Sequence, residues 1–171
     1  MGRRRASAWV LLVLGLAVSC GKDGAYGRRP DWKLRLPDGK EVRAPDYDGK
    51  VLIVDFWATW CPPCRREIPA FIALKKEYGD RGLEILGFSL DQDPGAHDRF
   101  VRDSGMNYLS LFASSGEARE VVRLFEEAVG EIQGIPTTLV IDRGGRIVHK
   151  HVGYAPREEF ERLIRPLLGA P

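Results

Sequence analysis

The sequence has few of the residues that mark several common classes of protein. It contains three cysteines and two methionines among 171 residues, and it has no internal repeat or low-complexity segment. Three cysteines cannot form a framework of several structural disulfides, and a structural zinc site needs four ligands, for which a second CxxC pair is missing. The apolar stretch near the N-terminus, Ala8 to Val18, has 11 residues, which is too short to span a bilayer as a helix.

The first twenty residues have the pattern of an export signal. Arg3 to Arg5 precede the short apolar stretch, and small residues follow it up to Cys20. We predict a signal peptide over residues 1–19, with cleavage before Cys20. The stretch Leu16 to Cys20 resembles a bacterial lipobox, in which the cysteine is lipidated and becomes the first residue. The alternatives are a plain signal peptide and an uncleaved anchor, with Cys20 incidental.

The charge of the remaining chain is balanced. The full sequence has 26 basic and 24 acidic side chains, and removal of residues 1–19 takes away three arginines and no acid, which leaves 23 against 24. No basic stripe with interleaved aromatic residues remains, so no nucleic-acid partner is predicted. The Gly-rich, polar residues 20–30 predict a flexible tether, and residues 31–171 predict one globular domain.

Apolar periodicity predicts alternating strands and helices within that domain. Prolines should kink the first helix at Pro69 and fray the last one at Pro166. The order of elements predicts an α/β domain with a central sheet covered by helices. The predicted elements are a hairpin over 33–43, strands over 51–56, 83–90 and 108–112, helices over 62–78, 94–104 and 118–125, a second hairpin over 138–152 and a closing helix from Pro156.

The most informative motif is the run Trp57-Ala58-Thr59-Trp60-Cys61-Pro62-Pro63-Cys64, which follows an apolar strand and opens a predicted helix. Cys61 stands at the helix start, where unpaired N–H groups and the positive end of the helix dipole stabilise its thiolate and lower its pKa. Pro62 and Pro63 suit the first helical positions, because these need no N–H and have φ near the proline value. Cys64, one turn further on, is close enough to form a disulfide with Cys61.

This cysteine pair predicts thiol–disulfide exchange. The Cys61 thiolate, which we expect to be exposed, attacks a substrate disulfide, and the sheltered Cys64 then attacks Cys61 and releases the reduced substrate. The two prolines between the thiols add no cationic or hydrogen-bonding side chain that would stabilise a free thiolate. The dithiol is therefore predicted to be a good reductant, and reduction of substrate disulfides is the expected direction.

Asp55 is anomalous within the apolar strand before the motif. A buried carboxyl group has a raised pKa and can exchange protons near neutrality, so we predict that Asp55 takes the proton of Cys64. The alternative is a carboxylate at a strand end that bonds to the backbone. Asp91, after the next strand, is a rival carboxylate, for which we favour a role as the cap of a surface loop.

The run from Phe56 to Cys64, with Pro69 after it and Ile135-Pro136-Thr137-Thr138 downstream, resembles the thioredoxin superfamily. Within it, the similarity is to the membrane-tethered TlpA/ResA-like thiol–disulfide oxidoreductases. The resemblance covers residues 31–168. It implies a thioredoxin fold, with a central mixed β-sheet flanked by helices, an N-terminal β-hairpin and a central insertion between Leu90 and Ile135.

The resemblance also implies roles for single residues. Pro136 would be a cis-proline beside the disulfide, and Ile135 would offer its backbone to an incoming peptide. At Gly87 the chain departs from thioredoxin, which has a lysine there, and the tethered branch often carries Asn in place of Asp55. The contact surface for substrates would be formed by Trp57, Trp60, Pro62, Pro63, Ile135 and Thr137.

The partners implied by the resemblance are proteins of a bacterial cell envelope. Family members reduce protein disulfides, receive electrons from membrane thiol transporters of the DsbD or CcdA kind, and in some cases serve cytochrome c maturation. For this chain we expect the same kinds of substrate and electron donor, and a lipid anchor at Cys20 that holds the protein to a membrane. We expect a monomer with no cofactor beyond the Cys61–Cys64 disulfide.

Two other functions fit parts of the sequence. A peroxiredoxin shares the fold, but its site resembles Thr-x-x-Cys, whereas Thr59 stands only two residues before Cys61. The cysteine pair could also bind copper(I) or zinc in a metallochaperone, and His149 with His151, on one face of a strand, could mark a weak metal site. We interpret these two histidines as edge-strand side chains and His97 as a helix-surface residue, and we predict no metal.

Overall fold

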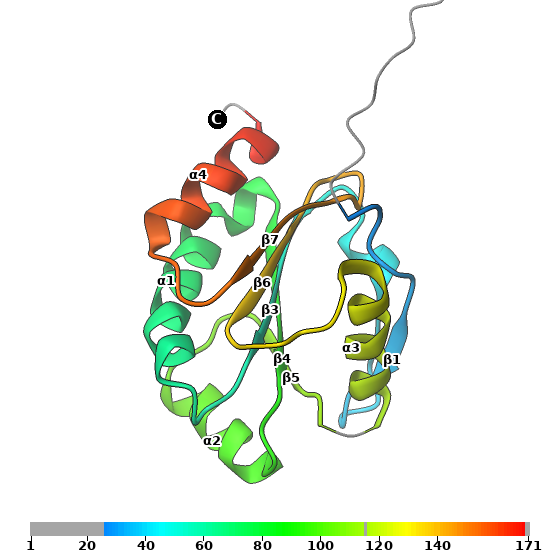
Figure 1. Cartoon of the computed structure of the whole chain (residues 1–171), viewed down its shortest axis with the longest axis vertical. Helices are drawn as coiled ribbons and strands as arrows, with labels where there is room; N and C mark the ends of the chain where they lie inside the picture. Colours follow the sequence, from blue (N-terminus) through cyan, green and yellow to red (C-terminus); the bar gives the residue numbers. More distant parts are fainter. Residues whose placement is uncertain (1–25, 115, 170–171) are drawn as a thin grey trace, which may run out of the picture.

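A mixed β-sheet of five strands forms the centre of the protein (Figure 1). The computed structural model describes residues 26–114 and 116–169. The strands are β3 (Val51–Trp57), β4 (Leu83–Ser89), β5 (Leu109–Phe112), β6 (Thr137–Ile141) and β7 (Ile147–Val152). They lie in the order β5-β4-β3-β6-β7, with β3 parallel to β4 and antiparallel to β6. The central strand β3 is buried along its whole length, which explains its unbroken apolar run.

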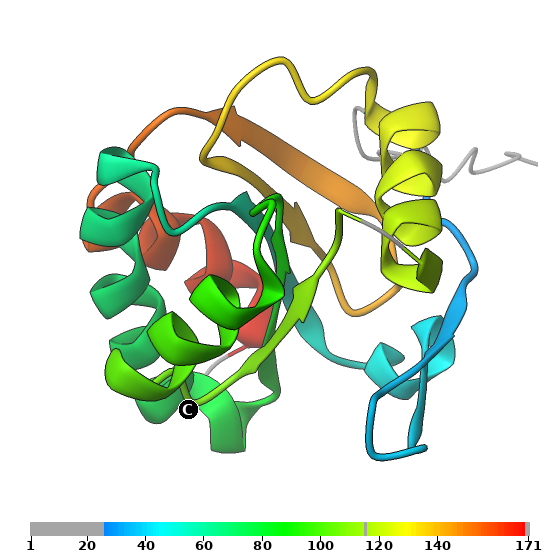
Figure 2. The same ribbon diagram turned by 90° about the horizontal axis from the view of Figure 1, so that it is seen from below.

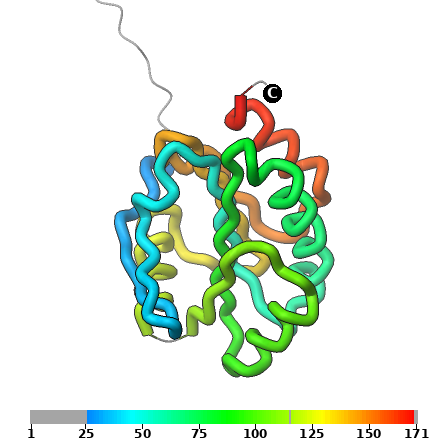
Figure 3. The backbone as a smooth tube through the Cα atoms, turned by 180° about the vertical axis from the view of Figure 1, so that it is seen from behind, coloured from blue at the N-terminus to red at the C-terminus, as the bar shows by residue number. Residues whose placement is uncertain are grey.

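Helices cover both faces of this sheet (Figures 1 and 2). One face carries α1 (Pro62–Tyr78) and α4 (Arg157–Leu168), and α2 (Pro94–Asp103) lies beside β5. The other face carries α3 (Gly116–Val129). An N-terminal hairpin of β1 (Lys33–Arg35) and β2 (Glu41–Arg43) packs against α3, as Figure 3 shows from behind. The structure thus confirms the predicted fold class and the N-terminal hairpin. It also confirms the two helices and the strand predicted between Leu90 and Ile135.

The alternation of β3 side chains divides the core into two parts. Val51 and Ile53 pack with apolar residues of α1 and α4. Leu52, Val54 and Phe56 pack on the opposite face, with α3 and the hairpin. Because successive side chains of a strand point to opposite faces, one central strand serves both cores.

The ends of α1 follow from its sequence. The helix begins with two prolines and continues through Pro69 to Tyr78. A short 3-10 turn, Gly79–Arg81, follows, and Gly82 has a φ of 92°, which a glycine adopts at little cost before the chain enters β4. In α4 the expected fraying at Pro166 is wrong, because the helix continues to Leu168, whose side chain is buried in the core.

The predicted boundary between tether and domain is also wrong. Residues 26–30 are attached to the turn region between β6 and β7. The N–H of Ile147 donates to the carbonyl oxygen of Gly27 at 2.9 Å, and the N–H of Arg29 donates to that of Gly145 at 2.8 Å. These backbone hydrogen bonds make residues 27–29 part of the folded domain rather than of a tether.

The predicted signal peptide over residues 1–19 and the predicted lipidation site Cys20 lie outside the described residues. Within the described ranges, no helix is both long enough and apolar enough to cross a membrane.

Gly87 of β4 packs closely against Trp57 and Ser110, and a substitution can test this packing. A Cβ atom at this position would lie 3.0 Å from Nε1 of Trp57 and 3.2 Å from Oγ of Ser110. We expect Gly87→Ala to lower the free energy of unfolding, measured by urea denaturation, by about 1–3 kcal/mol, because the indole or the strand must shift. The control is Gly79→Ala, whose Cβ would meet only the flexible side chain of Lys75 at 3.5 Å or more. It should leave stability unchanged or slightly raised, and an equal loss in both variants would contradict the packing argument.

Candidate active site

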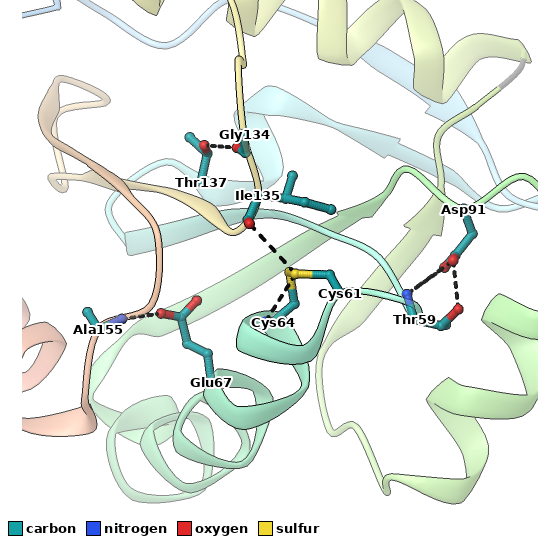
Figure 4. Close-up of a disulfide and its surroundings, with 9 residues drawn as sticks. All are labelled: Thr59, Cys61, Cys64, Glu67, Asp91, Gly134, Ile135, Thr137 and Ala155. Carbon is teal, nitrogen blue, oxygen red and sulfur yellow. Dashed lines mark hydrogen bonds between the residues drawn. A yellow bond between two sulfur atoms is a disulfide. The ribbon is translucent and has the colours of Figure 1, made fainter.

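Cys61 and Cys64 form a disulfide at the N-terminus of α1, with their sulfur atoms 2.07 Å apart (Figure 4). Cys61 is the N-cap residue, and its Sγ accepts a hydrogen bond of 3.2 Å from the backbone N–H of Cys64. Pro62 and Pro63 fill the first two helical positions and have no N–H. The Cys64 N–H is therefore the first helical donor that can reach the sulfur, and a Cys61 thiolate formed on reduction would meet the same donor and the positive helix end.

Both sulfur-bearing residues are buried in the disulfide form. Cys61 is 3% exposed and Cys64 is 1% exposed, so the expectation of an exposed Cys61 is wrong for this state. The cause is the packing of the pair with Ile68 of α1 and with the half-buried Ile135. A partner thiol therefore reaches Cys61 only when the partner docks closely on the surrounding surface.

The segment before β6 covers the disulfide from the other side. The Ile135–Pro136 peptide bond is cis, as expected, and the carbonyl oxygen of Ile135 lies 3.7 Å from Sγ of Cys61 (Figure 4). Thr137 donates from its hydroxyl to the carbonyl oxygen of Gly134 at 2.6 Å. Its side chain is buried, so the expectation that Thr137 lines the contact surface is wrong, and it stabilises the turn instead.

Large apolar side chains are exposed beside this segment. Trp60 directly precedes Cys61 and is 63% exposed, and Val152 and Tyr154 are the other exposed large apolar residues in the described part of the chain. The end of β7 at Val152 and the loop that carries Tyr154 are joined to the cis-proline segment, because the N–H of Gly153 donates to the carbonyl oxygen of Pro136 at 2.8 Å. These side chains offer an apolar docking surface next to the disulfide.

Trp57 does not belong to that surface, which corrects the prediction. It is the last residue of β3 and is fully buried. Its ring packs against Phe100 of α2 at a centroid distance of 5.3 Å, and its Nε1–H donates to Oγ of Ser110 at 3.2 Å. Among the other predicted contact residues, Pro62 is exposed and Pro63 is half-buried.

Comparison with known proteins agrees with this geometry. A family model described as "AhpC/TSA family" matches residues 27–150. "Thiol:disulfide interchange protein HelX" from Rhodobacter capsulatus is 34% identical over 135 residues, which cover 77% of this chain and 70% of HelX. This chain is a thiol–disulfide oxidoreductase of the AhpC/TSA family.

Two further matches support this assignment. "Thiol-disulfide oxidoreductase ResA" from Bacillus thuringiensis is 27% identical over 138 residues, which cover 81% of this chain and 75% of ResA. The crystal structure of a thiol:disulfide interchange protein of the thioredoxin family from Chlorobium tepidum superposes with a TM-score of 0.75 at 32% identity, over 83% of this chain and 96% of that one.

The oxidoreductase buries a carboxyl group in the middle of its sheet. Asp55 of β3 lies opposite Gly87 of β4 and Thr138 of β6, and one of its oxygens, Oδ1, has no hydrogen-bond partner among the described residues. Burial raises the pKa of Asp55 well above its usual value of 3.8, and the nearby charge of Glu67 raises it further, while Thr138 offsets part of the rise. Burial thus favours the neutral form of this carboxyl group.

Glu67 is a second buried acid, which the sequence analysis missed. It lies three residues after Cys64 on the same face of α1. Its Oε1 accepts the backbone N–H of Ala155 at 2.9 Å, and its Oε2 has no partner within the described ranges. Burial raises its pKa from 4.5 to about 7. The only sign of its burial in the sequence is its place on α1, next to the apolar stripe that contains Ile68 and Phe71.

Tyr108 completes a buried titratable cluster with Asp55 and Glu67. Its hydroxyl group is buried and has no partner in the described structure. Burial raises the pKa of Tyr108 well above 10, and the charges of Asp55 and Glu67 add to this rise. The three groups thus interact electrostatically, and the acid pair can hold or release a proton near neutral pH, mainly at Glu67.

Asp91 is buried, so its predicted place in a surface loop is wrong, although its role as a cap is confirmed. Both carboxylate oxygens lie 3.1 Å from the N–H of Thr59, and the Thr59 hydroxyl donates to Oδ1 at 2.7 Å. The hydroxyl of Ser89 donates to Oδ2 at 2.6 Å. Asp91 therefore fixes the loop that leads from β3 to Cys61.

His97 is buried rather than on a helix surface, which corrects the prediction. Its Nε2 lies 3.0 Å from Oγ of Ser110, the atom that also accepts the Trp57 indole, and its Nδ1 lies 3.0 Å from Oδ1 of Asp98. These contacts connect α2, β5 and the end of β3. They hold Trp57 in place behind the disulfide.

His149 and His151 lie on the edge strand β7, as predicted. Their rings are stacked with centroids 6.3 Å apart, and His151 meets the ring of Phe160 in α4 edge-on. Within residues 26–114 and 116–169, no group of three or more His, Cys, Asp or Glu side chains is arranged to hold a metal ion.

The substitution Glu67→Gln tests the buried acid. An unfolded chain releases the Glu67 proton near the ordinary pKa of 4.5, whereas the folded protein keeps it up to about 7. Because the folded state binds more protons in this window, Glu67 makes the free energy of unfolding fall as the pH rises through it. The variant should lose this part of the slope, a difference of about 3 kcal/mol across the window.

The measurement is urea unfolding from about pH 5 to about pH 8, the range over which the proton uptake of the two states differs. The glutamine amide does not titrate, and its oxygen can still accept the Ala155 N–H. The matched control is Glu158→Gln, an exposed position of α4, which should keep the wild-type slope. An unchanged slope in Glu67→Gln would show that the pKa of Glu67 is not raised in the folded protein.

Proposed function

We propose that this oxidoreductase is a reductase of protein disulfides in a bacterial cell envelope, tethered to a membrane through a lipidated Cys20. The observation that carries the proposal is the hydrogen bond from the Cys64 N–H to Sγ of Cys61 at the start of α1. It favours Cys61 as the attacking thiolate. The two prolines between the cysteines bring no further donor, so the thiolate is stabilised only moderately and the dithiol remains a good reductant.

The reaction transfers two electrons by two exchanges. The Cys61 thiolate attacks one sulfur of a substrate disulfide, so that a Cys61–substrate bond forms while the substrate bond breaks and its second sulfur leaves as a thiolate, which takes a proton. Cys64 then loses its proton and attacks Sγ of Cys61. The Cys61–Cys64 bond forms again, and the substrate departs with both thiols reduced.

The buried acids are placed to handle the proton of Cys64. Glu67 lies one helical turn after Cys64 and has a pKa of about 7, so it can accept a proton at neutral pH. Asp55 is fully buried nearby, and burial together with the charge of Glu67 raises its pKa well above 3.8. We therefore assign the Cys64 proton to this coupled pair of acids, with Glu67, whose pKa is about 7, as its first acceptor.

Repeated reduction outside the cytoplasm needs a source of electrons. The proposed donor is a membrane thiol transporter of the DsbD or CcdA kind, which would reduce the Cys61–Cys64 disulfide by the reverse exchanges. The proposed clients are protein disulfides, including those of apocytochromes c before haem attachment. Both proposals rest on the family of the chain, and the docking surface around Trp60 and Tyr154 supports a protein as the partner.

The variant Cys64→Ala tests the reductase mechanism. The first exchange remains possible, but the mixed disulfide on Cys61 cannot be resolved. We expect the variant to capture client proteins covalently in envelope fractions, as seen by mass spectrometry, and to reduce insulin with dithiothreitol no faster than dithiothreitol alone. Cys61→Ala is the matched control and should capture nothing.

Three measurements on these proteins separate the rival functions. Undiminished insulin reduction by Cys64→Ala would refute the two-step mechanism. Consumption of hydrogen peroxide without insulin reduction by the wild-type protein would instead indicate a peroxidase, and stoichiometric copper or zinc retained after dialysis would indicate a metallochaperone.

Cys20→Ser tests the tether. The full-length wild-type chain, expressed in a bacterium, should fractionate with membranes, and the variant should move to the soluble envelope fraction because it loses its acyl chains. A variant that stays in the membrane would indicate an uncleaved anchor. A wild-type protein in the soluble fraction would indicate a plain signal peptide.

A further inference from the structure

Two arginines follow the disulfide on the first turns of α1. Arg65 and Arg66 come directly after Cys64, and both side chains are exposed. Neither forms an ion pair with a carboxylate within the described residues, whereas arginines elsewhere, such as Arg43 and Arg157, do. Two unpaired cations thus stand at the rim of the reactive disulfide.

Aromatic rings hold these two arginines on different sides of the helix start. The guanidinium carbon of Arg65 lies 5.7 Å from the ring centre of Phe100 in α2. That of Arg66 lies 5.2 Å from the ring centre of Tyr154, in the loop before α4. A guanidinium group over a ring is attracted by the negative face of the ring and keeps its N–H donors free at its edge. The stacking therefore orders both groups before any partner binds.

The carboxylates of the site itself do not neutralise these cations. Glu67 is buried behind the disulfide, and Asp91 is buried and accepts hydrogen bonds from Thr59 and Ser89. The exposed side chains contributed by Trp60, Val152 and Tyr154 are large and apolar or aromatic. The docking surface next to Cys61 is thus apolar with two ordered positive charges.

We propose that Arg65 and Arg66 select protein disulfides that have aspartate or glutamate residues beside the cysteine, an inference that rests on the proposed reductase function. Each guanidinium group can bind a carboxylate through two parallel N–H donors, while the apolar part of the client lies on Trp60 and Tyr154. Because the side chains are already held by the rings, less conformational entropy is lost on binding. The charges also accelerate the encounter with an acidic client.

The test uses the pre-reduced full-length protein and three synthetic peptides. The peptides share one intrachain disulfide and differ only in the two residues that flank one cysteine, which are glutamate, glutamine or lysine. The second-order rate constant for oxidation of the protein is followed by the fluorescence of the tryptophans near the disulfide. We expect the glutamate peptide to react about three- to tenfold faster than the lysine peptide at low ionic strength, with the difference largely lost at about 0.5 M salt.

Charge reversal should invert this order. In Arg65→Glu/Arg66→Glu the lysine peptide should react faster than the glutamate peptide. The ratio of these two rates within each variant is the readout, because charge reversal beside Cys61 also changes the stability of its thiolate for every peptide. The matched control is Arg119→Glu/Arg165→Glu, with the same change of net charge on α3 and on the last turn of α4. It should keep the wild-type preference. Arg66→Lys, which keeps the charge but loses the planar group, should retain part of it.

Each other outcome is decisive. Equal rates for the three peptides with the wild-type protein would overturn the selection while the reductase function stands, whereas no oxidation by any peptide would refute the reductase function itself. An equal loss for all three peptides in the double variant would show that the arginines act on the Cys61 thiolate rather than on the client. Arginine-dependent binding to vesicles of anionic lipid, without a peptide preference, would assign the charges to the membrane.

Discussion

The hydrogen bond from the Cys64 N–H to Sγ of Cys61 is the constraint on which the rest of the site depends. It makes a reactive sulfur the cap of a helix, so the electrostatics of the helix start act directly on the atom that exchanges. Several distant elements serve this placement. Asp91 fixes the loop before Cys61 through Thr59, and the segment at Ile135 closes over the sulfur from the far side. The central strand β3 delivers the chain to this point from the middle of the sheet.

Behind the disulfide the protein buries polar groups that lower its free energy of unfolding. Asp55, Glu67 and Tyr108 are buried and leave oxygens without partners among the described residues, which costs free energy of folding. Ionisation of Glu67 adds to this cost as the pH rises through neutrality. The apolar cores on both faces of the sheet stabilise the domain enough to tolerate it. The proposed transfer of the Cys64 proton to these acids would explain why they are kept in the core despite this cost.

The sequence predicted the parts of the site that depend on local order and missed those that depend on distant contacts. The helix start at Cys61 follows from the residues beside it, and the apolar run before it identified the central strand. Burial of Glu67 is different, because it requires the Ala155 loop to pack over α1 from far along the chain. Burial of Trp57 and His97 likewise depends on β5, where Ser110 joins them. A single sequence carries no direct signal for such pairings.

The central claim is that the helix start activates Cys61 and not Cys64. It is tested most directly by the alkylation rates of the two cysteines in the reduced protein, measured with iodoacetamide and peptide mass spectrometry from about pH 5 to about pH 9, a range that spans activated and ordinary thiols. The account predicts that Cys61 is alkylated much faster than Cys64 below neutral pH, because only its thiolate meets the helix N–H. Equal rates, or a faster Cys64, would contradict it.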